Sequence, residues 1–201
     1  MISGIILASG YSKRFGKKDK LLYKINGKFI IEWVCDNAVN SDLDEVILVY
    51  RNEKINNIIQ ENKIKKIKNE KAYKGMSESM KIGIKTSNKN TKGYLFLMGD
   101  QPLINIDIIN NLINNFKNNS CEKIILPVFN GKKSSPTIFP VKYKIELLKT
   151  EGDKGGRLLL DKYKKDIIEV KFNNSKNKDI DKKSDIKITY DTINEEHWHF
   201  L

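Results

Sequence analysis

Short apolar runs alternate with helix-like patterns along this chain, and that alternation limits the possible folds more than any other feature. Strands are favoured at residues 2–7, 46–50, 65–68, 94–98, 123–128, 137–139 and 166–170. Helices are favoured at residues 29–40, 52–62, 77–85, 105–116, 142–149 and 156–163. Strands separated by helices build βαβ units. The pattern therefore predicts an α/β fold with a mainly parallel sheet.

The C-terminal part carries a different signal. Residues 172–185 are rich in Lys, Asn and Asp, a composition typical of a mobile segment. We expect residues 186–190 to be extended, ahead of a short final helix.

We expect residues 1–201 to form a single domain, because that length is enough for one sizeable core and neither a repeat nor a linker interrupts it. No apolar run is long enough to span a bilayer, and residues 1–3 lack a signal-peptide pattern. Cys35 and Cys121 lie far apart among core-like neighbours, as free thiols do in a reducing compartment. We therefore expect a cytoplasmic protein without a membrane partner.

The net charge is +12 and the pI is about 9.5, so a nucleic-acid-binding module is one alternative to an enzyme. The lysines are interspersed with Asn and Ile and have few aromatic neighbours. This pattern favours a solvated basic surface, with a few lysines that bind anionic small molecules.

A loop of small and basic residues follows the first apolar run. It contains Leu7, Ala8, Ser9, Gly10, Ser12, Lys13 and Arg14, and Lys20 lies just beyond it. Small residues let backbone N–H groups approach a ligand, and the basic side chains suit a polyphosphate. The spacing fits neither a P-loop nor the Gly-x-Gly-x-x-Gly dinucleotide fingerprint. The alternative is an ordinary turn with solvated basic side chains.

A carboxylate follows another buried strand, at residues 94–98. Gly99 removes side-chain bulk there, and Pro102 fixes the turn beyond Asp100. Asp100 would lie at the edge of the sheet where α/β proteins bind ligands, and it could hold Mg²⁺ together with substrate phosphates. The alternative is that Asp100 caps the helix that follows.

Two glycine-containing segments each precede an expected helix. Gly75 and Ser77 would leave free N–H groups and hydroxyls facing the cleft, where they could contact a ribose or a base edge. Ser77 could equally be a helix N-cap, and the two roles are compatible. Residues 152–157 form a Gly-rich turn whose basic residues could bind a second anion, or a loop in which Asp153 pairs locally.

These segments, in this order, resemble motifs of the MobA-like nucleotidyltransferases, which have a Rossmann-like domain. The opening loop is similar to Leu-Ala-Ala-Gly-x-Ser-x-Arg-Phe/Met-Gly-x-x-Lys, and residues 99–102 to the metal-site motif Gly-Asp-Gln/Met-Pro. Residues 75–83 are similar to Gly-Met/Leu-Ser-x-Ser-Leu/Met-x-x-Gly, and residues 152–157 to Gly-Asp-x-Gly-Ala-Arg. Both of these belong to the branch that includes molybdenum cofactor cytidylyltransferases.

The chain departs from the family pattern at two places. Ser134 and Ser135 replace the usual Gly and His/Asn before Pro136. The last motif of the family, Asp-x-Asp-Thr-Pro-Glu-Asp, is compared with residues 189–195, where Asp191 and Thr192 remain and Thr189 replaces the first Asp.

The resemblance implies a three-layer Rossmann-like α/β fold with a mainly parallel (mixed) sheet. It implies transfer of CMP from CTP to the phosphate of molybdopterin, giving molybdopterin cytosine dinucleotide and pyrophosphate, with Mg²⁺ as cofactor. A molybdoenzyme that receives the product would be a partner.

The resemblance also implies roles for individual residues. The implied catalytic residues are Arg14, Lys20 and Asp100, and the implied metal ligands are Asp100 and Asp191. The implied nucleotide-binding residues are Leu7, Ala8, Ser9, Gly10, Ser12, Gly75, Ser77, Ser79 and Gly99. The implied acceptor-binding residues are Ser135, Pro136, Asp153, Lys154 and Arg157.

The choice of base depends on few residues. Guanylyl-transferring relatives usually have Leu-Ala-Gly-Gly in the first loop and cytidylyl-transferring ones Leu-Ala-Ala-Gly, whereas this chain has Ser9 at the variable position. The motifs at residues 75–83 and 152–157 favour CTP. The alternative is a guanylyl- or cytidylyltransferase for another phosphorylated acceptor, such as a sugar or alditol phosphate. The nucleic-acid-binding module is the third hypothesis.

Overall fold

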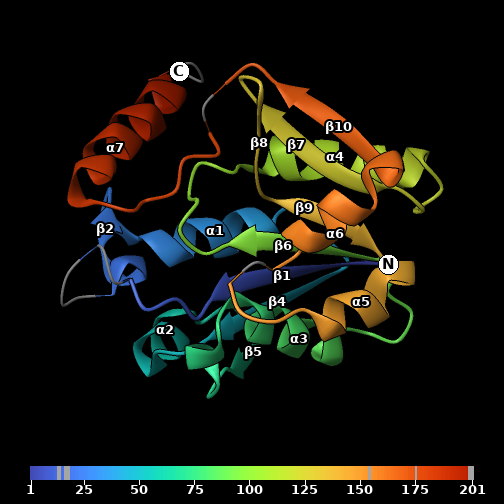
Figure 1. Cartoon of the computed structure of the whole chain (residues 1–201). Coiled ribbons are helices and arrows are strands. Elements are labelled where there is room, and N and C mark those ends of the chain that lie inside the picture. The colour runs from blue at the N-terminus through green and yellow to red at the C-terminus, as the bar shows by residue number, and fades with distance from the viewer. Residues whose placement is uncertain (13–14, 16–18, 154, 175, 199–201) are drawn as a thin grey trace.

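The computed structural model describes residues 1–12, 15, 19–153, 155–174 and 176–198, which form one central mixed sheet with helices on both faces (Figure 1). The strand order is β10-β7-β9-β6-β1-β4-β5, and β8 pairs with β7. The strands are β1 (Ile2–Ala8), β4 (Glu45–Tyr50), β5 (Ile64–Lys68), β6 (Gly93–Met98), β7 (Ile124–Phe129), β8 (Lys132–Lys133), β9 (Thr137–Pro140) and β10 (Ile167–Phe172). The pairs β1–β4, β1–β6, β4–β5 and β7–β10 are parallel, and β9 is antiparallel to β6 and β7.

Helices cover the sheet on its two faces, so the three-layer α/β prediction is confirmed. The helices are α1 (Ile30–Val39), α2 (Glu53–Ile58), α3 (Met76–Thr86), α4 (Ile106–Asn118), α5 (Lys144–Lys149), α6 (Arg157–Lys162) and α7 (Lys183–Trp198). Short 3₁₀ turns are η1 (Lys20–Leu22), η2 (Ala72–Lys74), η3 (Val141–Tyr143) and η4 (Lys164–Asp166), and β2 (Lys24–Ile25) and β3 (Lys28–Phe29) form a separate hairpin.

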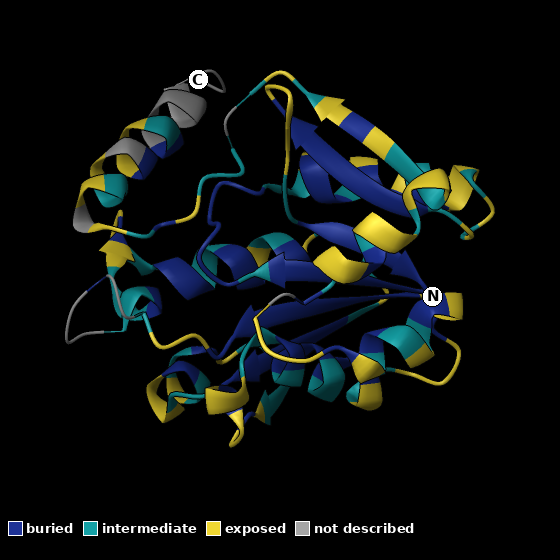
Figure 2. Ribbon diagram, in the orientation of Figure 1, coloured by how far each residue is buried: buried dark blue, intermediate teal, exposed yellow. Residues whose placement is uncertain are grey.

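Alternate side chains of each central strand enter two separate hydrophobic cores. Ile6 and Leu48 pack in the core beneath α1 and α4, whereas Ile5 and Ile47 pack in the core with α3 and α5. This is the two-residue period of a strand that is buried on both faces. The central strands are buried in Figure 2, whereas β10 at the edge is partly exposed. Parallel pairing brings the carboxyl ends of β1, β4, β5 and β6 to one edge of the sheet.

The expectation of an extended segment at residues 186–190 is wrong, because α7 covers it. The Asp185 carboxylate accepts hydrogen bonds from the backbone N–H groups of Asp181 and Lys182, at 3.0 and 2.7 Å. These bonds cap the N-terminus of α7. Thr189 and Ile193 are buried four residues apart on one face. Among the described residues, no helix is long and apolar enough to cross a membrane.

Candidate active site

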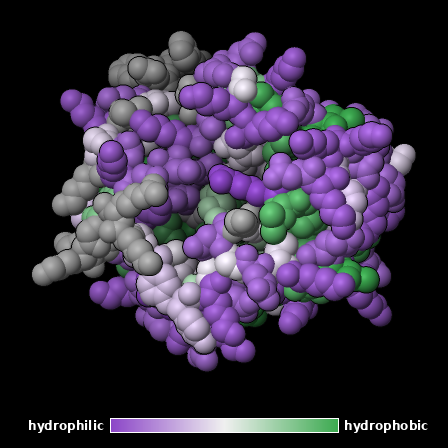
Figure 3. Space-filling view, viewed as in Figure 1, coloured by the Kyte–Doolittle hydropathy of each residue, from purple (hydrophilic) through white to green (hydrophobic). Residues whose placement is uncertain are grey.

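A cleft of about 680 Å³ opens at the edge where β1 and β6 end. It is lined by nine of the residues that the sequence singled out, namely Leu7, Ser9, Gly10, Ser12, Lys20, Gly75, Ser79, Asp100 and Asp153. Hydrophilic side chains dominate the face shown in Figure 3, with apolar side chains near its centre. Arg14 and Lys154 lie outside the described residues. Ala8, Ser77 and Gly99 are buried next to the cleft without lining it.

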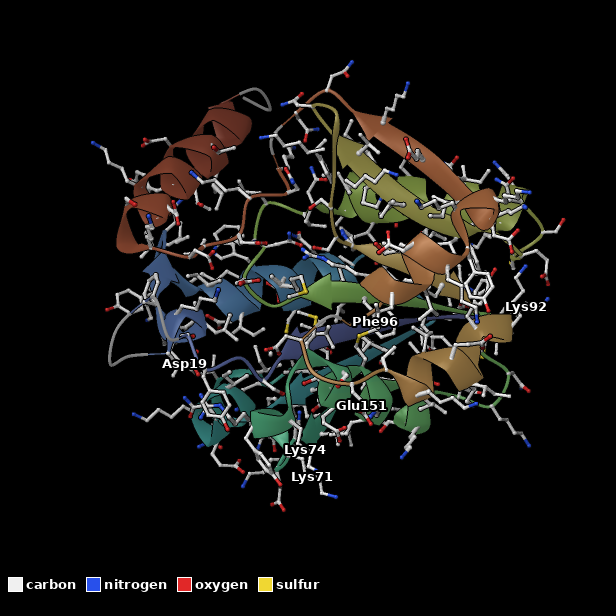
Figure 4. All side chains as sticks on the ribbon, in the orientation of Figure 1. Asp19, Lys71, Lys74, Lys92, Phe96 and Glu151 are labelled. Atoms are coloured by element: carbon white, nitrogen blue, oxygen red, sulfur yellow. The ribbon has the colours of Figure 1, made fainter. Side chains whose placement is uncertain are left out.

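The loop after β1 is held by Asp19, a residue that sequence reasoning missed. The Asp19 side chain is 5% exposed. Its Oδ1 accepts hydrogen bonds from the Leu21 N–H at 3.2 Å and the Ser12 hydroxyl at 3.4 Å. Its Oδ2 accepts one from Asn52 at 3.1 Å and lies 3.5 Å from an Arg51 nitrogen. This carboxylate, labelled in Figure 4, joins Ser12 after β1, η1 and the residues that follow β4, and so fixes Ser12 beside Lys20.

Lys20 lies between two carboxylates. Its ammonium pairs with Asp100 and is 3.3 Å from Asp181 Oδ1. Burial alone would lower the pKa of Lys20, but the charges and hydrogen bonds of Asp100 and Asp181 outweigh it and raise the pKa above its ordinary value. Lys20 is therefore a permanently charged cation at the floor of the cleft.

Asp181 and Asp179 were not singled out by the sequence analysis, although a signal was present. The Asp-x-Asp-x-x-x-Asp spacing of the last family motif also fits Asp179, Asp181 and Asp185. These residues lie ten positions before residues 189–195, the segment that was compared with this motif above. Desolvation and the neighbouring Asp100 raise the pKa of Asp179 to about 6. Asp191, by contrast, is exposed on α7 and does not line the cleft.

The carboxylates at the cleft floor fit a divalent metal ion. Asp100 Oδ1 is buried and has no hydrogen-bond partner among the described residues, and an unsatisfied buried carboxylate oxygen is costly unless a ligand completes it. No group of three or more His, Cys, Asp or Glu among those residues could hold a metal. Mg²⁺ commonly binds one or two carboxylates plus substrate phosphates, so Asp100 and Asp181 suit an ion that a phosphate helps to hold.

The opposite wall of the cleft is the N-terminus of α3. Gly75 has φ +99°, and a Cβ there would lie 2.6 Å from the Gly152 carbonyl carbon. Gly152 O accepts a hydrogen bond from Ser77 N–H, and Asp153 Oδ1 accepts one from Met76 N–H, both at 3.0 Å. The turn at residues 152–153 therefore packs on α3, and the Gly152 carbonyl and the Asp153 carboxylate each occupy one N-terminal N–H group that an anion could have used.

The remaining acceptor candidates lie outside the cleft lining. The Ser135 hydroxyl donates to Gln101 Oε1 at 2.9 Å, which joins the loop before β9 to the segment after β6. Pro136 follows in a cis peptide bond and is buried. Arg157 is exposed at the start of α6. Of these three residues, Ser135 is bonded to Gln101, the neighbour of Asp100, and none lines the cleft.

Comparison with known proteins gives a family match over most of the chain. The family described as MobA-like NTP transferase domain matches residues 4–167.

Curated relatives carry related activities. A 3-deoxy-manno-octulosonate cytidylyltransferase of Wigglesworthia glossinidia brevipalpis is 32% identical over 64% of this chain and 54% of its own length. A probable molybdenum cofactor guanylyltransferase of Thermococcus sibiricus is 29% identical over 56% of this chain and 55% of its own length. The chain thus spans about half the length of these relatives.

A solved structure shares the fold over nearly the whole chain. Rv0371C from Mycobacterium tuberculosis, in a complex with manganese, superposes with a TM-score of 0.81 at 18% identity. The match covers 94% of this chain and 98% of that one.

Proposed function

The chain belongs to the MobA-like NTP transferase family, and we propose that it transfers CMP from CTP to the phosphate of molybdopterin. The products are molybdopterin cytosine dinucleotide and pyrophosphate. One observation carries this proposal. A half-buried lysine, two carboxylates and a glycine-containing loop meet at the carboxyl edge of the sheet, where triphosphate and metal would bind together.

The proposed reaction is a displacement at phosphorus. An oxygen of the acceptor phosphate attacks the α-phosphorus of CTP, and the bond from that phosphorus to the bridging oxygen breaks. Pyrophosphate leaves with the electron pair. A phosphate monoester is largely ionised near pH 7, so the attack needs no general base. The difficulty lies in bringing negative charges together, and positioning and electrostatics overcome it.

Each residue of the cluster has a role in that task. Lys20 would exchange its carboxylate partners for phosphate oxygens and stabilise the charge that develops on the leaving group. The loop at residues 9–12 would bring backbone N–H groups to the phosphates. Asp100 and Asp181 would hold a divalent metal ion, which when bound neutralises phosphate charge. We also assign Arg14 to the triphosphate, on the family motif.

The choice of CTP is supported by a small feature of the first loop. The Ser9 hydroxyl donates to Val49 O at 3.1 Å, so its polarity is used within the sheet. Towards a ligand, Ser9 therefore behaves like the alanine of cytidylyl-transferring relatives. The second candidate is transfer to another phosphorylated acceptor, such as a sugar or alditol phosphate. It is favoured by a relative from Dictyoglomus thermophilum whose name, 2-C-methyl-D-erythritol 4-phosphate cytidylyltransferase, contains a phosphorylated alditol.

Pyrophosphate release tests the proposal. We expect release with CTP, Mg²⁺ and molybdopterin, and a loss on the order of 10²–10³-fold in Lys20→Ala and Asp100→Ala with the fold intact. Lys24→Ala, an exposed lysine on the adjacent hairpin, is the matched control and should retain activity. Near-normal turnover in either cluster variant would refute the assignment.

Separate experiments identify the nucleotide and the acceptor. Thermal-shift titration with CTP, GTP, UTP and ATP plus Mg²⁺ should give the largest stabilisation with CTP. A response to GTP alone would overturn the cytidylyl assignment. Sugar and alditol phosphates, tested in place of molybdopterin, distinguish the second candidate.

A further inference from the structure

Asn69 is a fully buried polar residue that no motif accounts for. It follows β5, and its backbone N–H donates to Tyr50 O at 2.6 Å, which extends the pairing of β4 with β5. Its Oδ1 accepts a hydrogen bond from Lys71 N–H at 2.9 Å. The backbone N–H can only donate, so the atom that faces it must be the amide oxygen. The amide nitrogen of Asn69 therefore faces the other way, towards Ser79.

The orientation of Asn69 dictates what the Ser79 hydroxyl can do. Asn69 Nδ2 donates to Ser79 Oγ at 2.9 Å, in a buried hydrogen bond. An amide nitrogen has no acceptor capacity, so the proton of the Ser79 hydroxyl must point elsewhere. The structure gives Ser79 Oγ no second partner among the described residues, and Ser79 lines the cleft. Ser79 is thus presented to a ligand as a hydrogen-bond donor.

The surroundings of Ser79 suit a neutral ring better than a phosphate. This part of the cleft is lined by Leu7, Ala72, Tyr73 and Met76, which are apolar or aromatic. The nearby Lys71 and Lys74 are exposed, and Figure 4 shows them at the outer surface of the molecule. Lys20 is held by its carboxylates at the other side of the site. A planar heterocycle fits between the Ser79 donor and the apolar wall.

We propose that Asn69 is a positioning residue that makes Ser79 a donor to the ring edge of a pyrimidine base. This inference rests on the proposed function, since it requires that the cleft bind a nucleotide. Cytosine has an acceptor at ring N3, whereas uracil has an N–H donor there. A donor fixed at Ser79 pairs with the first and opposes the second, so the Asn69–Ser79 pair discriminates CTP from UTP.

Asn69→Asp tests this by reversing the polarity of the hydrogen bond. The substituted side chain keeps an oxygen for Lys71 N–H but presents a second oxygen to Ser79, so Ser79 must donate inward and accept from the ligand. Dissociation constants for CTP and UTP are measured by calorimetry at pH 8 with Mg²⁺ and no acceptor. We expect CTP to bind ~10-fold more weakly and the CTP-to-UTP preference to fall by at least that factor.

Two further variants keep the test sharp. Asn88→Asp is the matched control. Like Asn69, Asn88 accepts a hydrogen bond at its Oδ1 from the N–H two residues on, here Asn90 at 2.9 Å, but Asn88 lies in an exposed turn. Its base preference should equal that of the wild type. Ser79→Ala should lower the CTP-to-UTP preference, and adding Asn69→Asp to it should change nothing more. If Asn69→Asp does not fold, Asn69→Ala, which removes the amide donor to Ser79, takes its place and should also lower the CTP-to-UTP preference.

The two proposals fail in different ways. A wild-type chain that binds no nucleoside triphosphate contradicts the proposed function. A wild-type chain that prefers CTP, with the same preference retained in Asn69→Asp and Ser79→Ala, overturns the role of Asn69 and leaves the proposed function standing.

Discussion

Lys20 is already paired before any ligand arrives, and this state shapes how the site would work. Its ammonium contacts Asp100 and Asp181, and both carboxylates face the cleft. A triphosphate without a metal ion would meet these negative charges. A triphosphate with a divalent ion would give the carboxylates a new partner and leave Lys20 free to contact the phosphates. Metal and nucleotide should therefore bind together.

Gly75 is the residue whose replacement should most disturb the cleft wall. Its φ of +99° and ψ of −178° lie in a region that side chains other than glycine rarely adopt. An added methyl group would also press on the Gly152 backbone. We expect Gly75→Ala to lower the free energy of unfolding by about 1–3 kcal/mol, measured by urea denaturation.

Gly10→Ala is the control for this prediction, because a Cβ at Gly10 meets no atom within 4 Å. Equal stability of the Gly75 and Gly10 variants would mean that the turn at residues 152–153 does not pack on α3.

At the scale of elements, the strands were predictable and the C-terminal segment was not. β1, β4, β6 and β7 are buried on both faces and read as continuous apolar runs. Residues 172–185 read as polar, yet Ile180 within them is completely buried and its N–H donates to Asp100 O at 3.1 Å. One apolar side chain anchors the segment, and local composition does not report such a tertiary contact.

Ile180 therefore holds Asp179 and Asp181 at the site. Ile180→Ala should lower the free energy of unfolding by about 2–5 kcal/mol, because a fully buried side chain leaves a cavity. It should also weaken CTP binding in the presence of Mg²⁺. Urea denaturation and calorimetry measure the two effects.

Ile145→Ala serves as the control, since Ile145 is 65% exposed and its truncation should change stability by less than about 0.5 kcal/mol. Similar behaviour of the two alanine variants would show that residues 172–185 are not anchored through Ile180.

At the scale of the whole molecule, the positive charge is concentrated on one edge of the sheet. Residues 51–92 contain twelve Lys and Arg but four Asp and Glu, which gives +8 of the total +12. These residues build α2, β5 and α3 (Figure 1) and also η2, and residues of η2 and α3 line the cleft. A basic edge next to the opening would attract anionic ligands from solution. The family match favours this interpretation over a nucleic-acid-binding module.

Site residues were predictable from the sequence where they belong to one local motif. They were not predictable where the fold brings together residues that are far apart in the sequence. Gly10, Lys20 and Asp100 stand in recognisable local patterns at strand ends, and all three line the cleft. Asp19 and Asn69 act through hydrogen bonds to other elements, so no local pattern marks them. The acidic spacing at residues 179–185 lacks the threonine and proline of the family motif, so the sequence alone does not distinguish it from the segment at residues 189–195.

The most direct test of the account compares two aspartates in the same pyrophosphate-release assay, with CTP, Mg²⁺ and the phosphorylated acceptor. Asp181 contacts Lys20 in the cleft, whereas Asp191 is exposed on α7. We predict that Asp181→Asn lowers turnover on the order of 10²-fold, and that Asp191→Asn retains wild-type turnover. Loss of activity in Asp191→Asn, with activity kept in Asp181→Asn, would contradict a reaction centred on Lys20, Asp100 and Asp181.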